Sequence, residues 1–282
     1  MHLNCYNFSG IIIGVQCECE LPESEKLKKF RSDCCALDSL VTVEFCNFLP
    51  DENEMNADSD IRWHYRSTRS SAETVDSPYV CVGFEGNNCI VRVLEKYRKD
   101  FGVDSVFRHA PVHHILMRGN AAVFHASYVL FNGEAILFTA PSGTGKSTQA
   151  ELWKKLRRAE IINGDRCLIR KTDGGFTAGG IHYSGTSDYC ESVNAPIKAI
   201  VLLAQAKQNR LTKPGGAEAF RILFRECSYS LYFEEDKQSA VDIIADIINT
   251  VPVIELACLP DESAVKTLED FFQGELNGKP VC

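Results

Sequence analysis

A glycine-rich loop constrains the fold of this chain more than any other feature of its sequence. The loop runs Ala140-Pro141-Ser142-Gly143-Thr144-Gly145-Lys146-Ser147-Thr148 and follows an apolar run, Ala135–Thr139, that is typical of a buried strand. An amphipathic stretch over Ser147–Ala159 comes next and predicts a helix. Strand, loop and helix in this order match the phosphate-binding pattern G-x-x-x-x-G-K-[ST], with Ala140 at its first position.

The residue types in this loop explain how it would hold a nucleotide with magnesium. Gly143 and Gly145 let successive backbone N–H groups point inward, and the start of the helix adds its positive dipole end. In this pattern the lysine reaches the β- and γ-phosphates, and the hydroxyl that follows it binds Mg²⁺. We therefore expect ATP and Mg²⁺ as ligands. The expected binding residues are Ser142, Gly143, Thr144, Gly145, Lys146, Ser147 and Thr148.

The charge balance and the apolar runs exclude two classes of partner. The 282 residues carry a formal net charge of −8, so we expect no nonspecific binding to nucleic acid, which demands a basic surface. No apolar run reaches the length of a membrane span, and Met1–Gly14 lacks the pattern of a secretory signal. The 13 cysteines are therefore expected to be reduced thiols of a cytoplasmic protein that does not bind membranes.

Two groups of potential metal ligands lack the spacing that metal sites use. Four cysteines near the N-terminus contain no C-x-x-C pair, so scattered thiols explain them more simply than zinc does. The three histidines between residues 109 and 114 lack an acidic or cysteine partner at helical spacing. We expect no metal at either group. Their members are Cys17, Cys19, Cys34, Cys35, His109, His113 and His114.

The periodicity of the chain changes near residue 118. Residues 1–118 read as short strands broken by turns, and we expect a β-rich subdomain without a recognisable chemical motif. Residues 119–282 alternate strands with helices, which predicts an α/β nucleotide-binding domain. The elements expected in the first part are a helix at Glu23–Arg31, a strand at Leu40–Phe48, a loop at Pro50–Asp60 and a hairpin of Tyr79–Phe84 with Cys89–Leu94.

In the second part the clearest local signal is Asn132-Gly133, a two-residue turn that joins strands at Ala121–Phe131 and Glu134–Thr139. A later strand passes through Ile161-Ile162 and ends near Asp165. The other expected elements are strands at Cys167–Lys171, Phe176–Ala178, Ala199–Ala204 and Val253–Leu256, and helices at Ala217–Cys227, at Lys237–Asn249 and from Asp261 to Phe272.

Asp165 is the candidate acidic partner of the loop. It lies 18 residues after Ser147, which is the length of one helix and a return strand. Phosphoryl transfer needs a carboxylate near the metal or the incoming hydroxyl. A turn aspartate beside Gly164 would give the same local sequence, so both interpretations stay open at this point.

From His125 to Arg210 the chain resembles the kinase core of bacterial HPr kinase/phosphorylases, which is of the PEP carboxykinase type, and especially their shorter kinase-like relatives. The loop itself carries the likeness, together with His125, which stands 22 residues before Ser147. Asn163-Gly164-Asp165-Arg166 resembles the Ala-Asp-Asp-Arg of that family, and Gln208-Asn209-Arg210-Leu211 resembles its Asp-Arg-Leu. The resemblance implies an α/β P-loop kinase core behind an N-terminal β-rich subdomain.

The resemblance also implies a role for each matching residue. Asp165 would accept the proton of a serine hydroxyl and, with Ser147, would contribute to the magnesium site. His125 would lie near the phosphates and that aspartate. Arg210 and Lys146 would stabilise charge on the transferring group. Without its spacing from the loop, His125 would be interpreted as a satisfied core histidine in a strand, and Arg210 reads equally as a solvated arginine.

Two departures from the family pattern stand out. Gly164 replaces the first of the two aspartates, and Gly180–Thr186 lacks the Glu-Ile-Arg-Gly-Leu-Gly signature that supplies a metal carboxylate and serves the reverse, phosphorylase reaction. His182 and Tyr183 in that stretch are candidates for lining a substrate pocket, because loop residues often do so.

We expect an ATP-dependent kinase that moves the γ-phosphate to a hydroxyl, with a serine of a peptide or small protein as acceptor. One alternative is a kinase of a free small molecule such as serine. The other is a nucleotide-binding regulatory module without phosphotransfer, which the two departures favour. Members of the family form rings, so the resemblance also implies a homo-oligomer.

Overall fold

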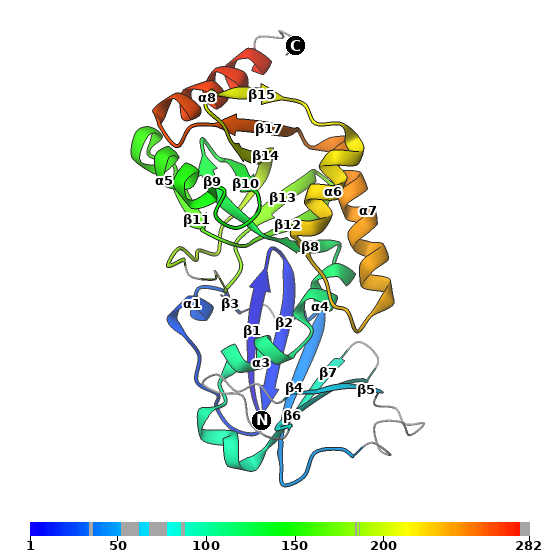
Figure 1. Ribbon diagram of the computed structural model, residues 1–282. Coiled ribbons are helices and arrows are strands. Elements are labelled where there is room, and N and C mark those ends of the chain that lie inside the picture. Colours follow the sequence, from blue (N-terminus) through cyan, green and yellow to red (C-terminus); the bar gives the residue numbers. More distant parts are fainter. Residues whose placement is uncertain are drawn as a thin grey trace. The chain divides into compact units, whose positions relative to one another are not determined.

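The structure is a computed structural model that describes residues 1–33, 36–51, 62–67, 78–85, 88–183, 185 and 187–276. The chain divides into two compact units, Met1–Gly119 and Asn120–Cys282 (Figure 1). Each unit combines helices with a sheet of parallel and antiparallel strands, so the chain is of mixed α/β class. Within the described residues, no helix is long and apolar enough to cross a membrane.

The N-terminal unit is built on one seven-stranded sheet in the order β3-β1-β2-β4-β7-β6-β5. Its strands are β1 (His2–Phe8), β2 (Ile11–Cys17), β3 (Arg31–Ser32), β4 (Ser39–Cys46), β5 (Arg62–Ser67), β6 (Val80–Glu85) and β7 (Asn88–Leu94). Its helices are α1 (Glu25–Lys28), the 3₁₀ helix η1 (Glu95–Asp100), α3 (Val103–His109) and α4 (Val112–Arg118). Aromatic contacts fix α3 against β1, because the Phe107 ring packs edge-on against Tyr6 and Phe8 at 5.2 and 5.5 Å.

The predictions for this unit hold where the local signal is strong. β4 occupies the predicted strand, and β6 and β7 form the predicted hairpin. The predicted helix over Glu23–Arg31 is wrong in its length, because α1 spans only four residues from its Ser24 cap and Arg31 already belongs to β3. The predicted loop Pro50–Asp60 lies, beyond its first two residues, outside the described part of the chain.

The C-terminal unit holds a larger sheet whose main path is β11-β9-β10-β14-β13-β12-β8-β16, with β17 pairing β14 and β15 pairing β17. Its strands are β8 (Ala121–Phe124), β9 (Ala126–Phe131), β10 (Glu134–Thr139), β11 (Glu160–Asn163), β12 (Cys167–Thr172), β13 (Gly175–Gly179), β14 (Asn194–Gln205), β15 (Arg210–Thr212), β16 (Cys227–Ser228) and β17 (Val253–Cys258). Its helices are α5 (Lys146–Arg157), α6 (Gly216–Glu226), α7 (Glu234–Thr250) and α8 (Glu262–Leu276).

The large sheet consists of two ladders that share β14. In the first ladder, which contains β10, the second half of β14 runs parallel to both β10 and β17. In the second ladder, which contains β12 and β8, the first residues of β14 run antiparallel to β13. Because β10, β14 and β17 are parallel, their carboxyl ends meet at one edge, where ligands bind in open α/β sheets.

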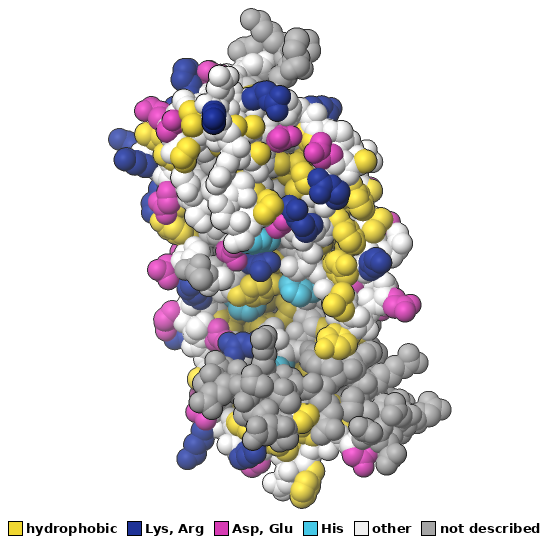
Figure 2. Space-filling model, viewed as in Figure 1, with side chains coloured by type: hydrophobic (Ala, Val, Ile, Leu, Met, Phe, Trp, Pro, Cys, Tyr) yellow, Lys and Arg dark blue, Asp and Glu magenta, His cyan; other side chains and the backbone are white. Residues whose placement is uncertain are grey.

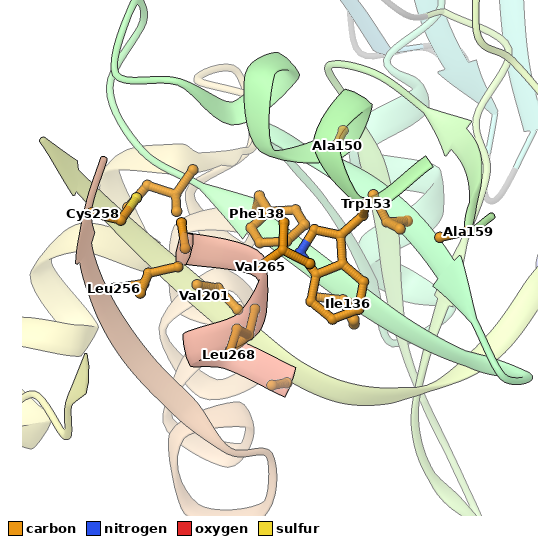
Figure 3. Packing of buried hydrophobic residues seen from close by; sticks show 14 of the residues in the cluster. Ile136, Phe138, Ala150, Trp153, Ala159, Val201, Leu256, Cys258, Val265 and Leu268 are labelled. Carbon is orange, nitrogen blue, oxygen red and sulfur yellow. The ribbon is translucent and has the colours of Figure 1, made fainter. Parts of the chain in front are cut away.

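The main core of this unit lies between the first ladder and the helices α5 and α8. Trp153 of α5 is fully buried there, among side chains of β10 and α8 (Figure 3). Its indole ring contacts Phe131 edge-on at 5.1 Å and Phe272 at 6.3 Å. Alternate residues of β10, Ile136 and Phe138, face this core, as the period of two in a strand requires. Packing of α5 therefore fixes the loop that precedes it.

The predicted single strand Ala121–Phe131 is wrong, because the chain breaks at His125 into β8 and β9. β8 pairs with β12 and β16 in the second ladder, whereas β9 pairs with β10 and β11 in the first. The backbone N–H of His125 donates to the Glu226 carbonyl at 2.8 Å and its carbonyl accepts from the Thr139 hydroxyl at 3.0 Å. His125 thus lies where the chain passes from one ladder to the other.

Candidate phosphate-binding site

The glycine-rich loop lies between β10 and α5, at the carboxyl edge of the parallel strands. Gly143 and Gly145 adopt φ of 78° and 121°, values that side chains strongly disfavour. A Cβ atom at either glycine would meet nothing within 4 Å, so the space beside the loop is open at both positions. Ser142, Ser147 and Thr148 are exposed and Thr144 is half-buried. The loop therefore leaves the hydroxyl groups of Ser142, Ser147 and Thr148 exposed, between the strand and the helix that the sequence predicts.

Lys146 is the first residue of α5, and its side chain is only 7% exposed. Its Nζ donates to the Ala140 carbonyl at 2.8 Å, which holds the ammonium group within the loop. Burial lowers the pKa of Lys146, and the negative charges of Glu226 and Asp165 oppose that shift.

Asp165 stands in the short connection between β11 and β12, which is the second place where the chain crosses between the ladders. Asn163 builds this turn, because its Oδ1 accepts from the backbone N–H groups of Asp165 at 3.1 Å and Arg166 at 3.0 Å. The Asn163 amide also donates to the Ile181 carbonyl at 2.9 Å and the Tyr183 carbonyl at 3.4 Å. One fully buried side chain thus fixes both the aspartate and the segment after β13.

The two chain crossings meet, and there His125 lies between two carboxylates. Its Nε2 is 2.8 Å from Asp165 Oδ1, and its Nδ1 is 3.0 Å from Glu226 Oε2. The side chains of His125 and Asp165 are 22% and 26% exposed, whereas that of Glu226 is 7% exposed. The structure therefore joins the predicted residues His125 and Asp165.

An arginine also lies at this cluster. The Nε of Arg166 is 3.4 Å from Asp165 Oδ2, and its positive charge contributes to lowering the pKa of Lys146. The sequence places Arg166 in the motif Asn163-Gly164-Asp165-Arg166, but its contact with Asp165 becomes visible only in the structure.

Arg210 lies elsewhere on the same edge of the sheet. It begins β15, opposite Ala257 of β17, and its side chain is exposed. β15 is three strands from β10, a separation of about 14 Å at normal strand spacing. Gln205, at the end of β14, connects this region to the loop by donating to the Gly143 carbonyl at 3.3 Å. The role expected for Arg210 stays a prediction.

The first departure from the family pattern has a steric cause. A Cβ atom at Gly164 would clash with the hydroxyl oxygen of Ser187, so the segment after β13 occupies the space that an aspartate side chain would need. The same segment covers Asp165 itself, because a Cβ atom at Gly185 would clash with Asp165 Oδ2. Gly185 has a φ of 56°, which favours glycine at this position.

Sequence reasoning missed two residues of this site. Glu226 is the last residue of α6 and reads in the sequence as an ordinary helix glutamate, 101 positions from His125. The sequence indicates Asn163 only as part of the motif Asn163-Gly164-Asp165-Arg166. Its position directly before Gly164-Asp165, where asparagine commonly caps a turn, is the signal that indicates its role.

The remaining candidate histidines, tyrosine and cysteines make local contacts. The His182 and Tyr183 rings pack edge-on at 4.9 Å, and burial raises the pKa of Tyr183. His109 Nε2 is 2.8 Å from the Tyr79 hydroxyl. Of the four N-terminal cysteines, Cys17 and Cys19 have their sulfur atoms 3.8 Å apart, and the other two lie outside the described residues.

The outer face of α6 is aromatic and partly exposed. Phe220 and Phe224 stack at 5.8 Å, and Phe224 contacts Tyr229 at 5.6 Å. Leu231 and Tyr232, which follow, are 86% and 60% exposed. Figure 2 shows hydrophobic side chains gathered over α6 and the turn that leads to α7. These five residues form what we call the aromatic face, and α6 connects it to Glu226.

Comparison with known proteins does not identify the function of this chain. No family model matches the sequence. No curated protein matches it either. Among solved structures the chain is similar to the HPr(Ser) kinase/phosphatase of Coxiella burnetii, at 11% sequence identity and a TM-score of 0.34. That match covers 55% of this chain and 93% of the other, and a likeness at this level decides neither fold family nor activity.

Proposed function

We propose that the C-terminal unit is a P-loop kinase that binds ATP with Mg²⁺ in the loop Ser142–Thr148. It transfers the γ-phosphate to a hydroxyl, and the acceptor is a serine of a peptide or small protein. One observation carries the proposal: Thr139, directly before the loop, donates to the His125 carbonyl at 3.0 Å, and His125 Nε2 lies 2.8 Å from Asp165 Oδ1, so the loop and the carboxylate share one site. A phosphate-binding loop beside an oriented carboxylate is the arrangement that phosphoryl transfer needs.

The residues of the site fit the ligands proposed. The space beside Gly143 and Gly145 is open to phosphate oxygens, and the ammonium group of Lys146 is held within the loop. The exposed Ser147 hydroxyl and the partly exposed Asp165 carboxylate are oxygen donors, which Mg²⁺ prefers. When bound, Mg²⁺ neutralises negative charge on the β- and γ-phosphate oxygens.

In the transfer step one bond to the γ-phosphorus forms and another breaks. A bond forms between the acceptor oxygen and the γ-phosphorus, and the bond from that phosphorus to the β,γ-bridging oxygen breaks. The electron pair of the broken bond leaves with ADP, and the proton of the acceptor hydroxyl moves to Asp165. Lys146 stabilises the charge that develops on the phosphate oxygens, so positioning and electrostatics supply most of the rate.

Two arginines are candidates for stabilising the transferring group. Arg166 already lies at Asp165, whereas Arg210 lies at the same sheet edge across three strands. Separate Arg166→Ala and Arg210→Ala variants would each show, by a lower kcat, which guanidinium acts on the transferring phosphate.

The aromatic face favours a peptide or protein acceptor over a free amino acid. Exposed apolar groups on a surface commonly mark a site for a protein partner. α6 presents Phe220 and Phe224 on the helix that ends at Glu226, whose side chain touches His125. An extended acceptor is able to contact this face while its serine reaches Asp165, whereas a free amino acid is too small to contact both.

Transfer of labelled phosphate from ATP tests the proposal. Wild-type protein is assayed with a library of serine peptides and with free serine, in the presence of Mg²⁺. Asp165→Asn is expected to lower the rate about 10²- to 10⁴-fold and to leave ATP binding nearly unchanged, because the base is lost while the loop is intact. Asp173→Asn, in the exposed turn before β13, is the matched control. Saturable nucleotide binding without transfer to any acceptor would identify a regulatory module instead, and labelling of free serine alone would identify a small-molecule kinase.

A further inference from the structure

Glu226 makes three contacts at the site, although the sequence marks it only as the end of a helix. Its backbone carbonyl accepts from the His125 N–H at 2.8 Å, and its Oε2 lies 3.0 Å from His125 Nδ1. Its Oε1 accepts from Arg225 Nε at 2.9 Å. The side chain is 7% exposed, so both carboxylate oxygens are held and largely shielded from water.

A role in stabilising α6 does not account for this residue. The last turn of a helix carries partial negative charge, so a buried carboxylate there is unfavourable by the helix dipole. Residues of positive charge are favoured at such positions. Arg225 and His125 supply the compensation through their contacts with the carboxylate, and His125 is the partner that belongs to the site.

We propose that Glu226 is a positioning residue that orients His125 for the reaction; this inference rests on the proposed kinase function. An ionised carboxylate only accepts hydrogen bonds, so Glu226 requires a proton on Nδ1 of His125. Asp165 must also be ionised to act as a base, so its Oδ1 accepts from an Nε2–H of His125 at 2.8 Å, and the arrangement uses a proton on each ring nitrogen. A carboxylate that orients a histidine, which in turn orients the reacting group, is the logic of a catalytic triad.

The orientation has a consequence for the base. Nε2 of His125 holds Asp165 Oδ1, whereas Oδ2, beside Gly185, is the second oxygen of the base. Arg166 Nε lies 3.4 Å from that second oxygen. Loss of Glu226 frees the His125 ring to turn, and Asp165 then loses the contact that fixes its plane. The transfer step slows, while the loop that binds ATP keeps its shape.

Two variants of Glu226 separate positioning from packing. Glu226→Leu fills the space and removes the acceptor. Glu226→Gln keeps the shape and keeps one oxygen that accepts from Nδ1–H. Glu218→Gln, at an exposed site in the first turn of the same helix, is the control. Trp153 fluorescence shows that each variant keeps the fold of this unit.

The first readout is the nitrogen NMR spectrum of protein labelled with ¹⁵N-histidine, with the His125 signal assigned from a His125→Gln variant. The bonded proton on Nδ1 is expected in the wild type and in Glu226→Gln, and its loss or rapid exchange is expected in Glu226→Leu. The second readout is labelled phosphoryl transfer. In Glu226→Leu, kcat is expected to fall about 10²-fold with KM for Mg-ATP within about twofold, and Glu226→Gln is expected to recover most of kcat.

The two readouts fail separately. Absence of transfer by the wild-type protein would overturn the kinase function, whereas the nitrogen spectra would still decide whether Glu226 orients His125. Glu226→Leu with an unchanged Nδ1 proton, or with wild-type kcat in an active kinase, would overturn the positioning role. A fall in kcat that Glu226→Gln does not recover would also overturn it, because the accepting oxygen would then be irrelevant.

Discussion

Replacement of Asn163 by alanine tests whether one buried amide builds the site. The Asn163 side chain is fully buried and makes four hydrogen bonds, of which the one to the Tyr183 carbonyl is long. The substitution leaves the N–H groups of Asp165 and Arg166 and the carbonyl of Ile181 without those partners. At about 1 kcal/mol for each good bond, and more for a buried group left unsatisfied, the cost is about 3–4 kcal/mol.

Urea unfolding followed by the fluorescence of Trp153 measures this cost. Trp63, in β5 of the other unit, is first replaced by phenylalanine so that only Trp153 reports. Asn209→Ala is the control, because Asn209 also bonds through both amide atoms but near the surface, and about 1 kcal/mol is expected there. A loss of less than about 1 kcal/mol for Asn163→Ala, with phosphoryl transfer unchanged, would refute the reasoning.

Two further outcomes follow from burial and from steric fit. Burial lowers the pKa of His109 to about 4, so the unfolded chain binds a proton more readily, and stability present above about pH 6.5 falls toward pH 4. The loss of about 3 kcal/mol should disappear in His109→Asn. Urea unfolding at several pH values measures this, and the same slope of unfolding free energy against pH in both proteins would contradict it. Gly164→Asp restores the aspartate of the resembling family but forces Ser187 aside, so a loss of about 1–3 kcal/mol and no gain in transfer are expected. Melting curves and initial rates check both expectations. An unchanged melting temperature would show that the segment around Ser187 moves aside without cost.

Local signals in the sequence predicted the elements that local physics determines. Asn132-Gly133 predicts a two-residue hairpin, and their φ values of 51° and 80° confirm it. The apolar run Ala199–Ala204 lies in the second half of β14, and the strand extends back to Asn194 because its first residues pair with β13. That extension depends on a partner strand and has no local signal.

The site residues that escaped prediction depend on contacts between distant segments. Ala121–Phe131 reads as one continuous strand, and only its pairing with two different ladders breaks it at His125. Glu226 ends a helix whose other charged residues, Glu218, Arg221 and Arg225, are exposed, so nothing in the local sequence distinguishes its buried carboxylate. The helices α3 and α4 have seven residues each, which is too short for helical periodicity to identify them.

Binding of Mg-ATP, measured by titration calorimetry, tests the central claim that Ser142–Thr148 holds a triphosphate. The wild-type protein is expected to bind one ATP, with an affinity that depends on Mg²⁺. Lys146→Ala is expected to weaken binding at least about tenfold, because a charge-assisted contact is lost, while Lys155→Ala on the exposed face of α5 leaves it unchanged. Absence of binding by the wild type, or equal affinity in Lys146→Ala, would contradict the account.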